Sequence, residues 1–171
     1  MKRFITLLLS VIFLSGCDVM DLFNPLPKQM PEDFSFSIIW NTFGVSSYNS
    51  KTGELIKYRE AKEPSLYKIS LFLSNEDTMN IYDKLHNLNF ANYNETLSSS
   101  NFYQSIPFSN LSISVTTSKI SKTLSANEVG NVELAKNESA QIFLDTINFI
   151  VNIIESSAEW IALPDFEIVY E

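Results

Sequence analysis

Cysteine, histidine and glycine are scarce in this chain of 171 residues, which holds one cysteine, one histidine and four glycines. A single cysteine leaves no disulfide, no Cys-ligated zinc and no Cys/His nucleophilic pair for the folded part of the chain. The glycines at positions 16, 44, 53 and 130 are too dispersed for a phosphate-binding loop. We therefore expect no cofactor and no metal site.

Long apolar runs are also missing, apart from one near the start of the chain. Lys2 and Arg3 precede an apolar stretch over residues 4–14, which is shorter than the about 20 residues that a membrane-spanning helix needs. A basic start, a short apolar core and small residues before a cleavage site are typical of a secretory signal. An uncleaved N-terminal helix is disfavoured because the run is short.

The end of this segment, Leu14-Ser15-Gly16-Cys17, resembles the lipobox of bacterial lipoproteins. The resemblance implies a diacylglycerol on Cys17, cleavage between Gly16 and Cys17, and acylation of the new N-terminus. Several acyl chains anchor a protein stably, whereas a single chain binds only marginally. An ordinary signal peptide with a chance cysteine is the alternative. Asp18 resembles an inner-membrane retention signal of enteric bacteria, and the choice between cell membrane and outer membrane stays open.

Basic residues are few in the expected mature chain. Removing residues 1–16 leaves 155 residues with 10 basic and 20 acidic side chains, a net charge of −10. Nucleic acids and anionic headgroups repel such a surface, so we discount both as partners. The length suits one domain. We predict a signal peptide over 1–16, a lipidated, proline-containing tether over 17–33 and a domain over 34–171.

Apolar and polar residues alternate along several segments, a period of two that predicts half-buried strands. The segments expected to be strands cover residues 34–41, 45–50, 54–60, 67–73, 108–117 and 119–125. Gly53 is expected at positive φ in a hairpin loop and Gly44 in a turn. Phe72 interrupts the alternation, so we expect it to face a second apolar surface. The tail is expected to add an edge strand around residues 166–170.

Helical spacing appears twice. Residues 74–89 begin with a capping Ser74 and carry an apolar stripe of Met79, Tyr82, Leu85 and Leu88. Residues 138–156 follow Asn137 as cap and are apolar over more than half of the helix surface, which predicts a central buried helix. The fold class predicted is α+β: a two-layer sandwich of a mainly antiparallel sheet with two helices packed on one face. The Ser/Thr face of the sheet is expected to meet water.

Residues 91–105 are rich in Asn, Ser and Tyr and are expected to form a long loop. Its aromatic residues Tyr93, Phe102 and Tyr103 are the candidate interaction surface, for sugar rings or a protein partner. The alternative is that these rings fold back and cover the core.

The sequence contains few residues in the patterns that catalytic sites require. His86 lies on the first predicted helix, with Asp83 as the nearby acid, and is expected to be a surface or boundary residue. No serine stands in a Gly-x-Ser-x-Gly elbow. Paired carboxylates could serve a glycosidase. The candidate acids are Glu54, Glu60, Glu63, Asp165 and Glu167. The last two are spaced to share a strand face, but an acidic surface is the favoured explanation for all of them. We therefore predict no catalytic residue.

The run of two strands, "Leu-Ser-x-Glu", helix and "Asn-Phe", ending over residues 69–90, resembles small bacterial domains of the emfourin type and related small α+β lipoproteins. Emfourin-like proteins inhibit metalloproteases, so the resemblance implies an inhibitor, without indicating any inhibitory residue here. The function expected is a non-enzymatic, membrane-anchored envelope module that binds a protein or a wall component. The alternatives are an anchored inhibitor of an extracytoplasmic protease and a hydrolase of envelope polymers.

Overall fold

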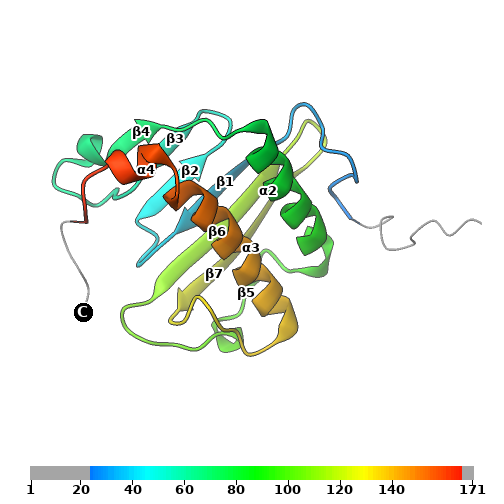
Figure 1. Ribbon diagram of the computed structural model, residues 1–171. Helices are drawn as coiled ribbons and strands as arrows, with labels where there is room; N and C mark the ends of the chain where they lie inside the picture. Colours follow the sequence, from blue (N-terminus) through cyan, green and yellow to red (C-terminus); the bar gives the residue numbers. More distant parts are fainter. Residues whose placement is uncertain (1–23, 167–171) are drawn as a thin grey trace, which may run out of the picture.

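The computed structural model describes residues 24–166, which form one sheet and a layer of helices (Figure 1). Seven strands stand in the order β4-β3-β2-β1-β6-β7-β5, and every neighbouring pair is antiparallel except β5 with β7. The strands are β1 (Ser35–Trp40), β2 (Ser46–Asn49), β3 (Glu54–Ile56), β4 (Lys68–Ser70), β5 (Thr96–Leu97), β6 (Ser109–Thr116) and β7 (Ser121–Val129).

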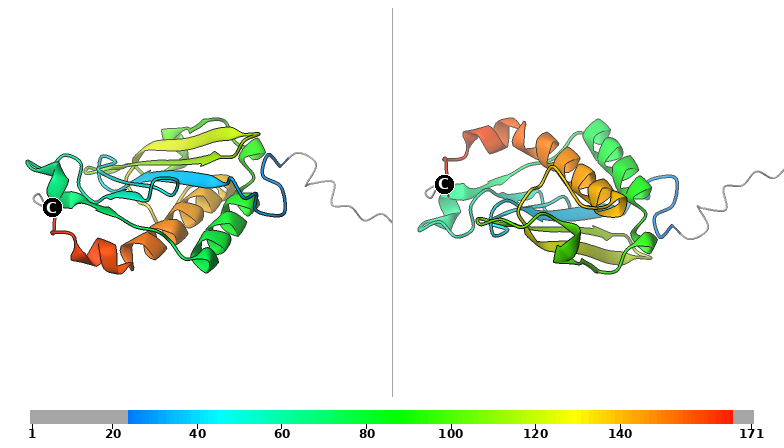
Figure 2. Two further views of the ribbon diagram at one scale, coloured as in Figure 1. Left: turned by 90° about the horizontal axis from the view of Figure 1, so that it is seen from above. Right: turned by 90° about the horizontal axis from the view of Figure 1, so that it is seen from below.

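Three α-helices cover one face of this sheet, as Figure 2 shows from two sides. They are α2 (Asn75–Leu88), α3 (Glu138–Glu155) and the short α4 (Ala158–Ala162). The predicted α+β class, a mainly antiparallel sheet with two helices on one face, is confirmed, and α4 adds a third, single-turn helix. No helix within residues 24–166 combines the length and apolar character needed to cross a bilayer.

The alternation of apolar and polar residues produces the central strands as expected. In β1, Phe36, Ile38 and Trp40 are buried, whereas the intervening side chains are half-buried. The register pairs Ile38 with Ile113 of β6, so successive strands place their apolar side chains on the same face. The core therefore lies between the sheet and the helices.

Both long helices begin where the sequence predicts. The Ser74 hydroxyl oxygen accepts a hydrogen bond from the Asp77 backbone N–H, and the Asn137 side chain caps α3 by accepting from Ala140 N. The expected stripe of α2 is wrong at one position: Met79 is exposed and Ile81 is buried in its place. Along α3 one face is buried, while Ile142 is exposed and Ile153 is half-buried.

The outer strands are shorter than expected because the chain turns early. The third strand ends at Ile56, and the fourth covers only Lys68–Ser70 after a 3₁₀ turn, η2 (Pro64–Tyr67). The predicted loop over 91–105 contains η3 (Phe90–Asn92), β5 and η4 (Ser99–Asn101). Gly44 and Gly53 both have positive φ, as the predicted turns require. The edge strand expected around residues 166–170 lies almost wholly outside the described residues.

The first described segment, residues 24–33, differs from the expected tether. Leu26 is only 1% exposed and belongs to the core. The Asn24 side-chain amide donates to the His86 carbonyl oxygen at 2.8 Å, and the Tyr82 hydroxyl donates to the Pro27 carbonyl oxygen. This segment is therefore folded against the C-terminal end of α2. Its prolines and mixed polarity predicted an extended tether, and the contacts with α2 were not predicted.

A buried lysine and two tryptophans of the core pack together at the end of the domain that carries α4. Lys57 is almost fully buried there; its ammonium donates to the Leu163 carbonyl oxygen at 3.3 Å and lies 5.1 Å from the centre of the Trp160 ring. The ring of Trp160 in turn stacks on Trp40 at a centroid distance of 5.5 Å. These contacts hold α4 on the sheet, so the segment after α3 is part of the domain.

Candidate functional site

The three aromatic residues of the predicted interaction loop do not form a common surface. Phe102 is fully buried in the core and pairs with Ala135 through an isolated β-bridge. Tyr93 is half-buried, and its hydroxyl donates to the Ser139 carbonyl oxygen at 2.9 Å. Tyr103 is 46% exposed, with the Lys136 ammonium 5.5 Å from the centre of its ring. The rings of Phe102 and Tyr93 thus fold back onto the domain, which is the alternative that the sequence analysis left open.

A polar hollow of about 540 Å³ lies beside Tyr93, between this loop and the start of α3. Asn137 links its two walls: the side-chain amide donates to Asn101 Oδ1 of the loop at 3.0 Å, and the side-chain oxygen accepts from the backbone N–H of Ala140 in α3 at 2.9 Å. Burial also raises the pKa of Tyr93. These hydrogen bonds fasten the loop to α3, so the hollow has a structural explanation.

The candidate catalytic residues are dispersed. His86 is half-buried in the last turn of α2, at the boundary position expected. Glu54 forms an ion pair with Lys68, and the Asp165 carboxylate lies 4.0 Å from the Lys57 ammonium. Glu167, like Gly16 and Cys17, lies outside the described residues. Within residues 24–166, no three His, Cys, Asp or Glu side chains gather as metal ligands would.

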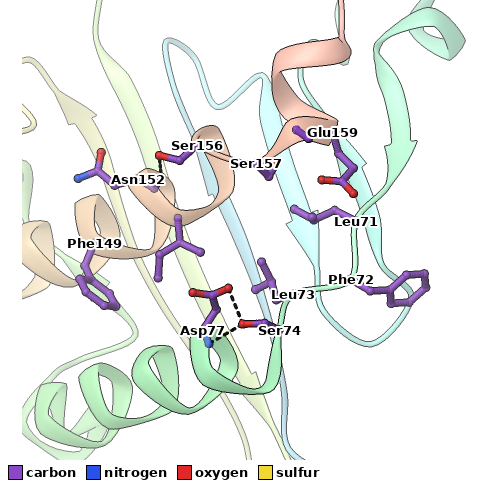
Figure 3. Close-up of a pocket in the computed structure, with 12 residues that line it drawn as sticks. Leu71, Phe72, Leu73, Ser74, Asp77, Phe149, Asn152, Ser156, Ser157 and Glu159 are labelled. Carbon is purple, nitrogen blue, oxygen red and sulfur yellow. Dashed lines mark hydrogen bonds between the residues drawn. The ribbon is translucent and has the colours of Figure 1, made fainter.

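A groove of about 560 Å³ opens where α2 and the end of α3 diverge (Figure 3). One wall is the segment that joins β4 to α2, and the other is the junction between α3 and α4. The groove is lined by Leu71, Phe72, Leu73, Ser74, Asp77, Phe149, Asn152, Ile153, Ser156, Ser157, Ala158 and Glu159.

The groove is lined by both apolar side chains and carboxylates. Leu73, Phe149 and Ile153 are half-buried and offer an apolar lining. Asp77 and Glu159 stand on opposite walls, as Figure 3 shows. This composition suits a ligand that combines apolar groups with positive charge.

The two carboxylates of the groove also meet the first requirement of a hydrolase, a cleft with acids on both sides. Such an enzyme needs one acid kept available to protonate the leaving group. Asp77 instead belongs to the N-terminal cap of α2, where its carboxylate accepts a hydrogen bond from the Ser74 hydroxyl at 2.6 Å. The Asp77 carboxylate is thus engaged within the cap of α2.

Sequence reasoning missed this groove. Phe72 was expected to face a second apolar surface, but its side chain is 74% exposed and is directed away from the groove, as Figure 3 shows. The ring lies against the hairpin glycine: a Cβ on Gly53 would stand 2.7 Å from it. The opposite wall comes from α3 and α4, about 80 residues further along the chain, so no local pattern could indicate it.

Comparison with models of protein families found no match, and a search of curated proteins found no similar sequence. The class of the protein is thus defined by its architecture, an α+β domain with one helical layer. The resemblance to lipoproteins and to emfourin-type domains stays a prediction from the residues that carry it.

Proposed function

We propose that this chain is an envelope lipoprotein, anchored by lipid on the extracytoplasmic side of the cell membrane or the outer membrane. Its domain is a non-enzymatic binding module for a protein or a wall component. The observation that carries the proposal is the succession of Lys2-Arg3, an apolar run and Leu14-Ser15-Gly16-Cys17. The net charge of −10 for the mature chain argues against nucleic acid as the partner.

The anchor would hold the domain close to the membrane. Six residues separate Cys17 from Asn24, where the docked segment begins. At about 3.6 Å per residue, Asn24 stays within about 25 Å of the lipidated sulfur. The end of the domain that carries Asn24 and the end of α2 therefore faces the bilayer.

The groove lies at the other end of α2. That helix has 14 residues, which at 1.5 Å per residue separates its ends by about 20 Å. Figure 1 places α4, which borders the groove, toward the end of the molecule opposite the N-terminal segment. An anchored domain would thus present the groove away from the membrane, where a partner can reach it.

Lipid labelling tests the anchor. Cells that express the full chain are grown with a radioactive fatty acid, and the label on the protein is compared with that on the Cys17→Ser variant. We expect label and membrane fractionation for the wild type, and their loss in the variant. Gly16→Ala is the control, because alanine keeps a small residue before the cleavage site. Equal acylation of the Cys17→Ser protein would refute the proposal.

A projecting loop favours an anchored protease inhibitor as the second candidate. Ile106 is 90% exposed and is followed by Pro107. The loop is fastened behind it, since Gly130 N donates to the Tyr103 carbonyl oxygen at 2.8 Å and Ser105 Oγ donates to the Gly130 carbonyl oxygen at 3.3 Å. Fastened loops with one prominent side chain suit insertion into a protease cleft. Inhibition of a secreted endopeptidase by the wild type but not by Ile106→Asp would support this function.

A further inference from the structure

We propose that the groove and the free edge of β4 together bind an extended peptide segment of a partner protein, in which apolar and basic side chains alternate. This inference rests on the proposed function as a binding module and names the chemistry of its partner. Three independent features carry it: the backbone of the sheet edge, the apolar lining and the distribution of charge.

The first feature is the backbone of β4. In an antiparallel pair, every second residue forms hydrogen bonds with the neighbouring strand. Lys57 N donates to the Tyr67 carbonyl oxygen at 2.9 Å, and Leu71 N donates to the Gly53 carbonyl oxygen at 2.7 Å. Residues 67 and 71 therefore face β3, and the N–H and C=O groups of Lys68 and Ser70 face outward. No other strand of the described chain lies beyond β4.

An open edge of this kind accepts an added strand, which gains affinity from main-chain hydrogen bonds. The chain beyond β4 continues along the wall of the groove through residues 71–73. Burial alternates there: Leu71 is buried, Phe72 is exposed and Leu73 is half-buried. A guest strand beside this wall would alternate in the same way, with every second side chain on the helix-covered side.

The second feature is the apolar lining. Leu73, Phe149 and Ile153 leave part of their surface exposed inside the groove. Covering apolar surface contributes about 25 cal/mol per Å² before the costs of binding are subtracted. An aliphatic side chain of the guest strand fits this lining better than a polar one, so the groove selects apolar residues at alternate positions.

The third feature is charge. Helices α2, α3 and α4 carry seven acidic side chains and one lysine: Glu76, Asp77, Asp83, Glu138, Asp145, Glu155 and Glu159 against Lys84. Asp77 and Glu159 line the groove itself. A basic segment is attracted to this field, whereas a second copy of the acidic chain is repelled. The last residues of the chain, 167–171, contain two acids and no base, so charge also disfavours them as the occupant.

Fluorescence anisotropy tests the proposal on the full-length lipidated protein in detergent micelles. The probe is a labelled eight-residue peptide of alternating valine and lysine, and its counterpart alternates valine and glutamate. We expect binding of the lysine peptide, at least tenfold weaker binding of the glutamate peptide, and weakening by salt because the charges are exposed. Equal binding of both peptides would overturn the proposal.

Two variants locate the binding site. Asp77→Asn with Glu159→Gln removes the charges of the groove, and Asp83→Asn with Asp145→Asn removes two charges from α2 and α3 outside it. We expect the first pair to weaken binding of the lysine peptide about tenfold, and the second pair to change it less than threefold. Equal losses in the two double variants would show that net charge alone attracts the peptide, and would overturn the groove as the site.

Ser70→Pro tests the sheet edge. Its N–H faces away from β3, so proline removes a donor from the open edge without breaking the β3 ladder. We expect weaker peptide binding with little change in the unfolding temperature. Ser70→Ala keeps the N–H and serves as the control. Should Ser70→Pro disturb the fold, Ile153→Ser tests the apolar lining, and binding unchanged by both variants would overturn the proposal. Lipid labelling of Cys17 tests the anchor and peptide binding tests the groove. The two measurements are independent, so one proposal can be refuted while the other holds.

Discussion

The two faces of the sheet are built by the same strands and have opposite characters. On the helix-covered face, β1 and β6 supply buried apolar side chains such as Phe36, Trp40 and Val115. On the other face the same strands supply small hydroxyl residues such as Ser37 and Ser114. The covered face supplies the burial that stabilises the fold, and the hydroxyl residues of the open face are only half-buried.

The open face is also ordered by its register. Along one row, Thr96, Ser125, Ser112, Ile39 and Ser47 stand side by side on five successive strands of the sheet. In the next row, the hydroxyl oxygens of Ser114 and Thr123 are 2.8 Å apart, within hydrogen-bond distance. These contacts are exposed and contribute little free energy. Burial, rather than the number of cross-strand contacts, therefore decides how much each face stabilises the domain.

Two adjacent residues of β6 are expected to show the largest difference in stability between the two faces. Ile113 is fully buried on the covered face, and Ser112 lies on the open face. We expect Ile113→Asp to reduce the free energy of unfolding by at least about 4 kcal/mol, because it puts an unpaired charge into the core. Ser112→Asp is expected to change it by less than about 1 kcal/mol. Urea denaturation measures both, and similar losses would contradict the assignment of the two faces.

Much of this architecture was predictable because its determinants are local. Alternation fixed the faces of β1 and β6, and Ser74 and Asn137 marked the starts of α2 and α3 through side-chain caps. Gly53 was likewise predictable, since the hairpin demands positive φ. Each of these features depends on neighbours within a few residues, which is the range that sequence patterns cover.

Features set by distant contacts were not predictable. The burial of Leu26 depends on the C-terminal end of α2, about 60 residues away, and the groove depends on the divergence of α2 from α3. The loop aromatics show the same limit. Composition alone could not distinguish a buried Phe102 from an exposed Tyr103, because their directions follow from pairing with the segment around Ala135.

Truncating these two neighbouring aromatic residues is expected to change stability by an intermediate amount. Phe102→Ala removes a fully buried ring, and such truncations typically cost about 3–5 kcal/mol. Tyr103→Ala removes an exposed ring and is expected to cost less than about 1 kcal/mol. The midpoint of urea unfolding should therefore fall sharply for the first variant only. A comparable fall for Tyr103→Ala would mean that the contact of its ring with Lys136 matters more for stability than its exposure indicates.

The smallest expected effect concerns a hydroxyl on the covered face. Tyr48 of β2 is buried, and its hydroxyl donates to the Leu71 carbonyl oxygen at 3.3 Å. Burial raises the pKa of Tyr48 to about 12. The folded state thus holds this proton more tightly than the unfolded state, whose tyrosine has the ordinary pKa near 10. The corresponding stability is complete below pH 10 and is lost as the pH rises toward 12.

Tyr48→Phe removes both the hydrogen bond and this titration. At pH 8 we expect the variant to be less stable by about 1 kcal/mol, the usual net contribution of one hydrogen bond. The difference should shrink between pH 9 and pH 11.5, because only the wild type loses stability through this hydroxyl. Urea denaturation at pH 9 and at pH 11.5 measures the difference in free energy of unfolding between wild type and variant. Tyr103→Phe is the control on an exposed ring. A difference that stays constant with pH would show that the Tyr48 hydroxyl is not shielded from water, and that the covered face is open at β2.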